Sequence, residues 1–356
     1  MATTTELEPL QIESIPAQPS PLRNEVTSIE GGVRDDCKIT FKCNTRLFVI
    51  LLSIQSPVDS VEGSYLKRLK DPLESGDEEK SEQIFEELID LLAGLCQPVF
   101  RKFAAIAPGS THSRPTLYNL LYLEVLQLRL NTTKGTAMLY LQDGPQMSTP
   151  NSFRNKNLKL PIFKPSEIEI LDILKGDTVF KALIQGSVIC AKVIGYQNST
   201  KSILREISLM QRISEARMDS RLRTPTLLGL ISSEDDSGLI LGLLMDYIES
   251  GPLVSDLFSL EVDLIPRIRR ETWAKQISDD LGRLHKIGLV WGDAKAGNII
   301  IDKESNPWII DFGGGYTDNW VDANSADSVM GDLQGLRQIL KFLQLPDQYY
   351  QTYSGP

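Results

Sequence analysis

Two residue types that commonly carry chemistry are scarce in this sequence. Its 356 residues include only two histidines, His112 and His285, which argues against a histidine-rich metal site and against a Ser-His-Asp triad. None of the four cysteines belongs to a C-x-x-C pair, so we expect reduced and chemically idle thiols at Cys37, Cys43, Cys96 and Cys190. Any chemistry is therefore expected to depend on carboxylate and amide side chains.

Positive charge and long apolar runs are also scarce. The net charge is −10, so the average surface repels nucleic acids and anionic membranes, and an ATP site would need local positive charge or a metal ion. The longest apolar run, residues 47–54, is interrupted by Ser53 and is too short to span a bilayer. No signal peptide is visible at the N-terminus. We therefore expect an intracellular protein, cytoplasmic or nuclear, with no nucleic-acid or membrane partner.

The composition itself is that of a soluble globular protein. Hydrophobic residues make up 41% of the chain, enough to bury a sizeable core, and the length allows two ordinary domains. Residues 1–35 are rich in Thr, Glu, Pro and Ser and predict a disordered tail. Residues 144–165 hold four prolines and many small polar residues, which predicts a linker. We therefore expect one module at 36–143 and a second domain at 166–356.

The N-terminal module shows secondary-structure patterns but no motif that carries chemistry. Residues 38–56 are rich in β-branched and aromatic side chains and predict one or two strands. A helix start is indicated at residues 75–77, and apolar residues follow at helical spacing over 84–95. Residues 116–143 predict another helix or a strand pair that turns at Gly135. We expect an α+β module whose role the sequence leaves open.

The second domain begins with short β-rich runs and continues with helices. The expected strands lie at 166–174, 178–184, 187–194, 226–232, 238–247, 299–302 and 307–310, and the expected helices at 198–216 and 266–287. The order is therefore a small β-rich lobe followed by a helical lobe.

The segment 289–316 (LVWGDAKAGNIIIDKESNPWIIDFGGGY) places three polar side chains in an apolar setting. Asp293 is followed by Asn298 after four residues, and Asp311 follows an apolar strand. A loop with the first two, beside a hairpin that ends in the third, would gather two carboxylates and an amide oxygen. Hard oxygen ligands of this kind suit Mg²⁺ that carries phosphate. The segment therefore predicts phosphoryl transfer, in which positioning and charge neutralisation supply most of the catalysis.

The combination D-x-K-x-x-N, a β-hairpin and I-I-D-F-G, after a helix that ends in Leu-His, resembles the catalytic segments of eukaryotic protein kinases. The resemblance implies that Asp293 orients the substrate hydroxyl or accepts its proton. It implies that Lys295 contacts the transferring phosphate, as in Ser/Thr-specific members. It also implies that Asn298 and Asp311 bind Mg²⁺, with ATP as the phosphate donor. The expected fold class is α+β: a two-lobed protein kinase-like fold with an N-terminal α+β extension.

The same resemblance implies a lysine in the β-rich lobe and a glutamate partner for it. Lys192 follows Ala191 in the apolar run SVICAKVI, which is similar to V-A-I-K. A lysine flanked by apolar residues has to find an anion. Glu206 lies on or near the apolar face of the next predicted helix and is the expected partner, while Glu215 is the weaker choice.

An adenine site is expected where the two lobes join, between a small lobe at 166–245 and a large lobe at 249–356. The run LILGLLMDYI resembles the hinge of the family, with Met245 as gatekeeper. The resemblance implies that backbone groups of Asp246 and Ile248 face adenine. Gly176 is the one glycine in the loop ILKGDTV, where the family has three. ATP affinity is therefore open, because backbone amides approach phosphates closely only where side chains permit.

Two further departures concern regulation and substrate docking. Trp291 and Gly292 stand where the family has His and Arg before the catalytic aspartate. The family arginine pairs with a phosphate on the activation segment, so we expect no activation by phosphorylation there. The segment lacks A-P-E, and the chain ends at Pro356, so we expect a truncated large lobe and an incomplete peptide platform.

Three functions fit these observations. The first is a Ser/Thr-type protein kinase, favoured by the complete catalytic set. The second is a small-molecule kinase of the aminoglycoside or choline kinase type, which Gly292-Asp293 and the missing peptide platform would fit. The third is a pseudokinase that acts as a binding scaffold, which the poor glycine loop favours. The substrate is expected to be a protein or small-molecule hydroxyl, and the oligomeric state is open.

Overall fold

A computed structural model describes residues 24–31, 35–103, 114–142, 144–154, 159–195, 200–216, 222–235, 237–250 and 256–346. The chain divides into two compact units, Met1–Pro150 and Asn151–Pro356. The tail expected to be disordered at 1–35 lies mostly outside the described residues. Its described part includes a strand, β1 (Asn24–Glu30), which pairs antiparallel with β2 (Cys37–Cys43). Backbone pairing to an apolar neighbour strand gives this polar stretch a structure that its composition does not predict.

The first unit is built on a six-stranded sheet. Its path runs β1-β2-β3-β4-β5, with β6 paired to β4, and only the β3–β4 pair is parallel. The remaining strands are β3 (Arg46–Leu52), β4 (Glu124–Thr133), β5 (Thr136–Leu141) and β6 (Gln146–Met147). Lys134 and Gly135 both have positive φ between β4 and β5, as a tight hairpin requires. The strand pair that turns at Gly135 is thereby confirmed.

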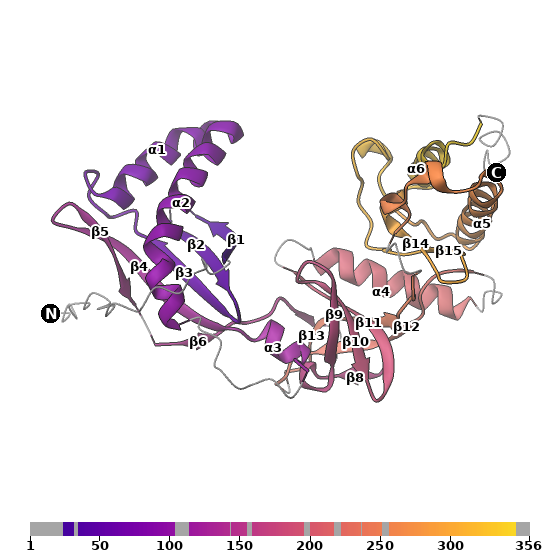
Figure 1. Ribbon diagram of the computed structural model, residues 1–356, viewed down its shortest axis with the longest axis horizontal. Helices are drawn as coiled ribbons and strands as arrows, with labels where there is room; N and C mark the ends of the chain where they lie inside the picture. Colours follow the sequence, from indigo (N-terminus) through magenta and orange to yellow (C-terminus); the bar gives the residue numbers. More distant parts are fainter. Residues whose placement is uncertain are drawn as a thin grey trace. The chain divides into compact units, whose positions relative to one another are not determined.

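Two long helices, α1 (Val61–Ser75) and α2 (Glu78–Phe103), cover one face of this sheet, and α3 (Leu117–Leu121) is short (Figure 1). Gly76 ends α1 in the left-handed conformation, and Asp77 accepts from the Lys80 amide at the start of α2. The helix start predicted at residues 75–77 is confirmed. Helix α1 could not be predicted from the sequence, because its proline and few apolar residues weaken the helical pattern.

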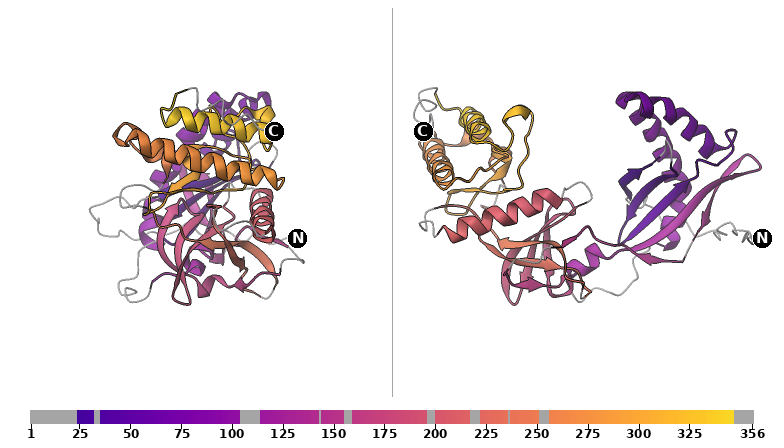
Figure 2. Two further views of the ribbon diagram at one scale, coloured as in Figure 1. Left: turned by 90° about the vertical axis from the view of Figure 1, so that its right-hand side faces the viewer. Right: turned by 180° about the vertical axis from the view of Figure 1, so that it is seen from behind.

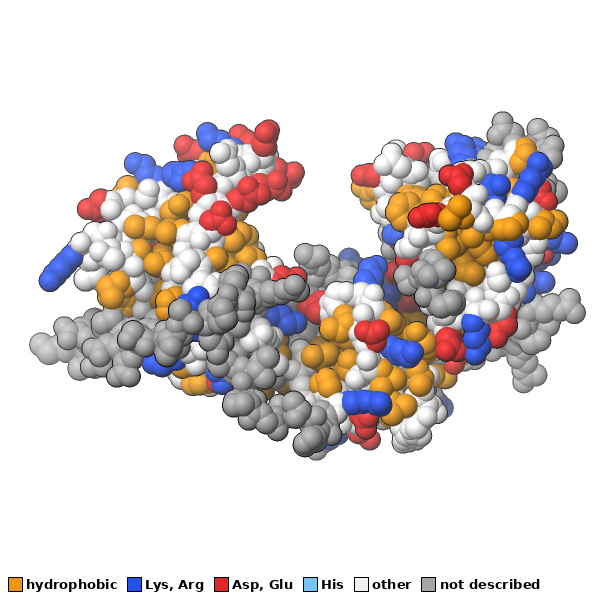
Figure 3. Space-filling view, viewed as in Figure 1, with side chains coloured by type: hydrophobic (Ala, Val, Ile, Leu, Met, Phe, Trp, Pro, Cys, Tyr) orange, Lys and Arg blue, Asp and Glu red, His pale blue; other side chains and the backbone are white. Residues whose placement is uncertain are grey.

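The core of the first unit lies between the helices and the sheet. Phe100 of α2 packs on Phe41 and Phe48, with ring centroids 5.9 and 4.8 Å apart. Such aromatic pairs contribute about 0.5–1.5 kcal/mol beyond the area they bury. On the outside, acidic residues at positions 71–79 gather around the junction of the two helices (Figure 3). The excess negative charge of the chain is thus concentrated in part on this end of the unit.

The second unit contains a seven-stranded sheet with the path β8-β12-β13-β11-β10-β9, and β7 pairs with β13. Its strands are β7 (Phe153–Arg154), β8 (Ile162–Phe163), β9 (Glu169–Lys175), β10 (Val179–Ile184), β11 (Ser187–Val193), β12 (Leu227–Ser232) and β13 (Leu239–Asp246). Segment 144–165, expected to be a linker, thus supplies β6 to the first sheet and β7 and β8 to the second. Burial of Phe153 helps to hold it there.

One helix packs on this sheet, and a helical lobe follows (Figure 2). The helix is α4 (Thr200–Glu215), and the lobe holds α5 (Arg267–Lys286), α6 (Val329–Phe342) and the hairpin of β14 (Ile299–Ile301) and β15 (Pro307–Ile309). One continuous apolar core joins Ile207 of α4 with Leu281 of α5 and Leu340 of α6. The unit therefore has the α+β, two-lobed architecture that the sequence predicted, and these strands and helices confirm the predicted order. None of the described helices is long and apolar enough to cross a membrane.

Candidate active site

The ammonium group of Lys192 lies at the centre of the site. Lys192 is on β11, and its Nζ is 2.7 Å from Oε2 of Glu206 on α4 and 2.7 Å from Oδ1 of Asp311 after β15. The side chains of Lys192 and Glu206 are only 11% and 2% exposed. The three residues come from three separate parts of the chain, so the site forms only when β11, α4 and the end of β15 lie next to one another.

Burial and charge act against each other within this trio. Burial alone would lower the pKa of Lys192, but attraction to the Glu206 and Asp311 carboxylates raises it above its usual value. Burial raises the pKa of Glu206, so its charge depends on the adjacent ammonium. Burial also opposes ionisation of Asp311, but Lys192 and, to a smaller extent, Lys175 hold its pKa below the usual range. The site thus keeps a lysine cation and an aspartate anion side by side in a largely buried place.

Asp311 reaches this position through an unusual backbone conformation. It follows β15 with φ of 61°, a left-handed value that aspartate adopts more readily than most side chains. The next residues continue in an open segment in which Gly314 and Gly315 also have positive φ. The strand therefore ends in a sharp turn that directs the Asp311 carboxylate towards Lys192.

The loop between α5 and β14, called the catalytic loop because of its resemblance to that segment of protein kinases, gathers the other predicted residues. Lys295 Nζ lies 2.6 Å from Oδ2 of Asp293, and Asn298 Nδ2 donates to the same oxygen at 3.0 Å and to the Asp293 carbonyl at 2.9 Å. Thr317, which comes later in the chain, donates to Oδ1 of Asp293 at 3.0 Å and accepts from Lys295 at 2.8 Å. Asp293, Lys295 and Asn298 are therefore brought together, and Thr317 completes the group.

A buried aspartate on α6 holds the beginning of this loop in place. Asp332 accepts from the backbone amides of Trp291 and Gly292, each at 2.8 Å, and its Oδ2 lies 2.8 Å from Nε2 of His285. Trp291 is fully buried, and its indole donates to the carbonyl of Ile310 at 2.9 Å. The loop is therefore fixed on both sides, by α6 and by the strand that leads to Asp311.

Arg205 of α4 is bound by the same loop. Its guanidinium donates to the carbonyls of Val290 and Trp291, each at 3.0 Å, and to the carbonyl of Phe312. It also lies 3.4 Å from Oδ1 of Asp327. Arg205 therefore connects α4 to the catalytic loop and to the segment after Asp311.

The turn between β9 and β10 is tight. The Thr178 amide donates to the Lys175 carbonyl, and Gly176 has φ of 51°. This four-residue turn offers fewer backbone amides than a long glycine-rich loop would. Lys175 adds positive charge at the end of β9, close enough to Asp311 to lower the pKa of that carboxyl.

The predicted hinge follows β13. Met245 and Asp246 end the strand, and Ile248 lies two residues further on. The Asp246 amide donates to the Thr226 carbonyl and is therefore engaged in the sheet. The Lys303 amide donates to the Glu249 carbonyl, and this bond ties the hinge to the β14–β15 hairpin.

The donor set of this site fits a magnesium ion. The Asn298 side chain forms its hydrogen bonds through Nδ2, so its carbonyl oxygen is the atom that can bind a cation. Asp311 supplies a carboxylate that stays ionised beside Lys192. Mg²⁺ usually takes one or two carboxylates and obtains its other ligands from water and phosphate. Among the described residues, no group of three or more acidic, histidine or cysteine side chains is placed to hold a metal ion.

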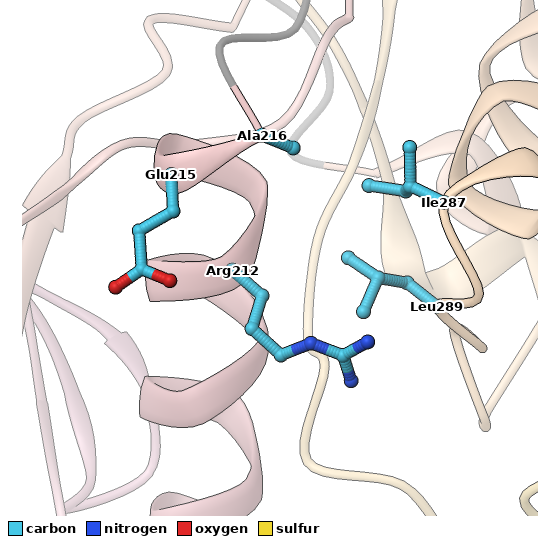
Figure 4. A pocket seen from close by; sticks show the side chains of 5 residues that line it. All are labelled: Arg212, Glu215, Ala216, Ile287 and Leu289. Atoms are coloured by element: carbon cyan, nitrogen blue, oxygen red, sulfur yellow. The ribbon is translucent and has the colours of Figure 1, made fainter.

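A separate pocket of about 310 Å³ lies at the C-terminal end of α4 (Figure 4). Arg212 points from the helix towards Ile287 and Leu289, while Glu215 points away from them. The pocket lining includes none of the residues predicted to bind ATP or metal. Glu215, the weaker candidate for the lysine partner, thus lies at this pocket, whereas Glu206 binds Lys192.

Fold and site together define a protein-kinase-like domain: a β-rich lobe with a lysine–glutamate pair, and a helical lobe with D-x-K-x-x-N and D-F-G. Comparison with known proteins gives the same class, because a family model for the protein kinase domain matches residues 176–333. The relatives include "Serine/threonine-protein kinase Sgk1-B" of Xenopus laevis, 28% identical over 155 residues, covering 43% of this chain and 35% of that protein. "Serine/threonine-protein kinase Sgk3" of Rattus norvegicus is 26% identical over 181 residues, covering 48% and 36%. The chain thus spans about a third of the length of these relatives.

Proposed function

We propose that the second unit is an ATP- and Mg²⁺-dependent phosphotransferase that phosphorylates serine or threonine hydroxyls of proteins. The observation that carries the proposal is the position of Lys192, whose ammonium contacts Glu206 and Asp311 at once. In protein kinases, the lysine–glutamate pair and the aspartate of D-F-G must both be in place for phosphoryl transfer. Here the Lys192–Glu206 pair is formed and Asp311 lies beside it, which supports the proposal.

Each residue then has a role that follows from its position. Lys192 would bind the α- and β-phosphates of ATP, while Asn298 and Asp311 would hold Mg²⁺, which neutralises phosphate charge when bound. Asp293 would accept a hydrogen bond from the attacking hydroxyl and take its proton as the new oxygen–phosphorus bond forms and the bond to ADP breaks. Lys295, 2.6 Å from Asp293, would neutralise charge on the transferring phosphate. The Asp246 carbonyl and the Ile248 backbone would bind adenine.

Specificity for serine and threonine rests on two observations. Lys295 occupies the place that is typical of Ser/Thr-specific members, and its ammonium also binds Thr317. The relatives reported above are named serine/threonine-protein kinases. A protein substrate with an aliphatic hydroxyl is therefore proposed.

A second candidate is a pseudokinase that binds partners without phosphoryl transfer. The tight turn at Gly176 favours it, because few backbone amides can surround the phosphates of ATP there. A small-molecule kinase would use the same residues on a different acceptor. Phosphoryl transfer to a protein substrate would exclude the pseudokinase. Transfer to a small molecule in place of a protein would indicate the small-molecule kinase.

The test is transfer of labelled γ-phosphate from Mg·ATP to an arrayed library of serine, threonine and tyrosine peptides. We expect transfer to serine and threonine peptides and at least a hundredfold loss in Asp293→Asn. Asp318→Asn, an exposed aspartate later in the same lobe, is the matched control and should keep wild-type activity. Equal activity of Asp293→Asn, or transfer to tyrosine peptides only, would contradict the proposal. Transfer to aminoglycosides or choline in place of peptides would support a small-molecule kinase.

A further inference from the structure

Arg205 occupies space that two glycines leave open. A Cβ on Gly292 would lie 2.5 Å from Nη2 of Arg205, and a Cβ on Gly314 would lie 2.9 Å from its Nε. Both glycines also have positive φ, 96° and 79°, which side chains rarely adopt. The guanidinium therefore fits between the catalytic loop and the segment after Asp311 because both positions lack a side chain.

The contacts of Arg205 fix the two segments that carry the catalytic groups. The carbonyls of Val290 and Trp291 belong to the loop that leads to Asp293, and the carbonyl of Phe312 follows Asp311. A guanidinium presents several N–H groups in a rigid fork, so it can bind three carbonyls at once, which an ammonium group cannot do with the same geometry. One side chain of α4 thus binds both segments.

Arg205 also precedes Glu206 on the same helix. Successive residues on an α-helix are about 100° apart around its axis, so fixing one side chain limits the rotation of the helix. With Arg205 held by three carbonyls, Glu206 is directed towards Lys192, from which it is 2.7 Å away. The position of the lysine–glutamate pair is therefore coupled to the Arg205 contacts.

The negative charge opposite Arg205 belongs to the chain itself. Oδ1 of Asp327 lies 3.4 Å from the guanidinium and accepts from the Gly315 amide at 3.2 Å, although this side chain is 52% exposed. In kinases that are switched on by phosphorylation, a phosphate on this segment pairs with an arginine and orders it. Here Asp327, which lies on the corresponding segment, supplies a carboxylate to Arg205 of α4 without any modification.

We propose that Arg205 is a positioning residue that holds α4 and Glu206 against the catalytic loop, with Asp327 in place of a phosphate. It takes over from the arginine that Gly292 replaces, but it acts from α4 and not from the loop. The inference rests on the proposed phosphotransferase function for its kinetic part. Its structural part, the attachment of α4 to the loop, can be measured without activity.

The kinetic test is a double-mutant cycle of Arg205→Met and Glu206→Gln. Each single variant is expected to lose at least tenfold in kcat/KM for ATP, and the double variant should lose clearly less than the product of the two single losses, because part of the effect of Arg205 acts through Glu206. A merely structural role would make the two losses multiply. Arg269→Met, an exposed arginine of α5, is the matched control and should keep wild-type kinetics. Multiplying losses, or a loss below twofold in Arg205→Met, would overturn the proposal.

The second test is hydrogen exchange of the same variants. Peptides that cover 289–293 and 311–315 should exchange at least tenfold faster in Arg205→Met than in wild type, and Arg269→Met should leave them unchanged. Unchanged exchange in Arg205→Met would overturn the inference. If the wild-type protein transfers no phosphate but hydrogen exchange is still faster in Arg205→Met, the proposed function fails while the attachment of α4 to the loop is supported. Should Arg205→Met not fold, Arg205→Lys, which keeps the charge but not the fork, is measured in the same way with the same expected direction.

Discussion

Asp332 accepts a 2.8 Å hydrogen bond from the backbone amide of Trp291, 41 residues earlier in the chain. The same carboxylate, 1% exposed, accepts from the Gly292 amide and pairs with His285. The position of the catalytic loop is thus set from α6, through a residue whose hydrogen bonds go to Trp291, Gly292 and His285. This relationship explains how Gly292 can replace an arginine while the loop keeps its shape.

Removal of this carboxylate should destabilise the second unit. Asp332→Ala leaves two buried amides without a partner, and each unsatisfied group costs about 1–3 kcal/mol, so we expect a loss of roughly 3 kcal/mol or more in the free energy of unfolding. All four tryptophans of the chain lie in this unit, so denaturant unfolding followed by tryptophan fluorescence reports on it selectively. The control Asp318→Ala should change the free energy by no more than about 0.5 kcal/mol. A loss below 1 kcal/mol for Asp332→Ala would show that the loop is held by other contacts.

Trp291 stands at the position in the sequence where the kinase family has a histidine. Because the side chain is fully buried and donates to Ile310, Trp291→Ala should cost about 3–5 kcal/mol. Trp291→Phe keeps a ring but leaves that carbonyl unpaired, so a smaller loss of about 1–3 kcal/mol is expected. The same denaturant experiment measures both through the remaining tryptophans. Equal losses for the two variants would mean that the ring volume contributes little.

The polar residues of the site could be predicted from the sequence because they form a spaced motif. Asp293, Asn298 and Asp311 lie in short loops between apolar runs, so their spacing predicts that they gather, while the resemblance to protein kinases indicated Lys192 within its apolar run. The contact between Lys192 and Glu206 could also be predicted, because Glu206 lies on the apolar face of its helix. The kinase-like order of strands and helices follows the same periodicities.

Contacts that depend on tertiary packing could not be predicted in this way. Neither Asp332 nor Arg205 stands out in the sequence, because nothing local shows which backbone amides or carbonyls a side chain will bind. The available signal for Asp332 is that it is an acidic residue on an otherwise apolar helix face. Strand β1 was missed for a related reason: its partner, and not its own composition, makes it a strand.

Activity should not depend on phosphorylation of the segment after Asp311. Replacing Ser325 or Ser328 by glutamate should change the rate of peptide phosphorylation less than about twofold, because Arg205 already has a carboxylate partner in Asp327. Glutamate at Thr317 should lower the rate at least tenfold, since the Thr317 hydroxyl binds Asp293 and Lys295. The measurement is kcat of protein whose unphosphorylated state is verified by mass. A strong gain of activity in any of these variants would refute this expectation.

The cysteines should resist alkylation while the protein is folded. Burial raises the pKa of Cys37 to about 11 and the pKa of Cys96 and Cys190 to about 12. Only the thiolate reacts with iodoacetamide. At about pH 8 the labelling rate of the folded protein should therefore be lower than the rate in denaturant by roughly a hundredfold or more. The labelling rate should increase as the pH approaches these pKa values. Mass spectrometry of labelled peptides measures each site. Fast labelling of Cys190 would indicate that the sheet beside Lys192 opens readily.

Binding of Mg·ATP at Lys192 and Asp311 is the central claim, and a thermal shift tests it most directly. If Mg·ATP is supplied at about ten times its Kd, the stabilisation is about 1.4 kcal/mol, and Tm should rise by roughly 3–6 °C. We expect Lys192→Met, Asp311→Asn and chelation of Mg²⁺ each to abolish this rise, while Lys341→Met, which changes an exposed lysine of α6, should preserve it. No rise in wild type at millimolar Mg·ATP, or a rise that persists in both site variants, would contradict the account.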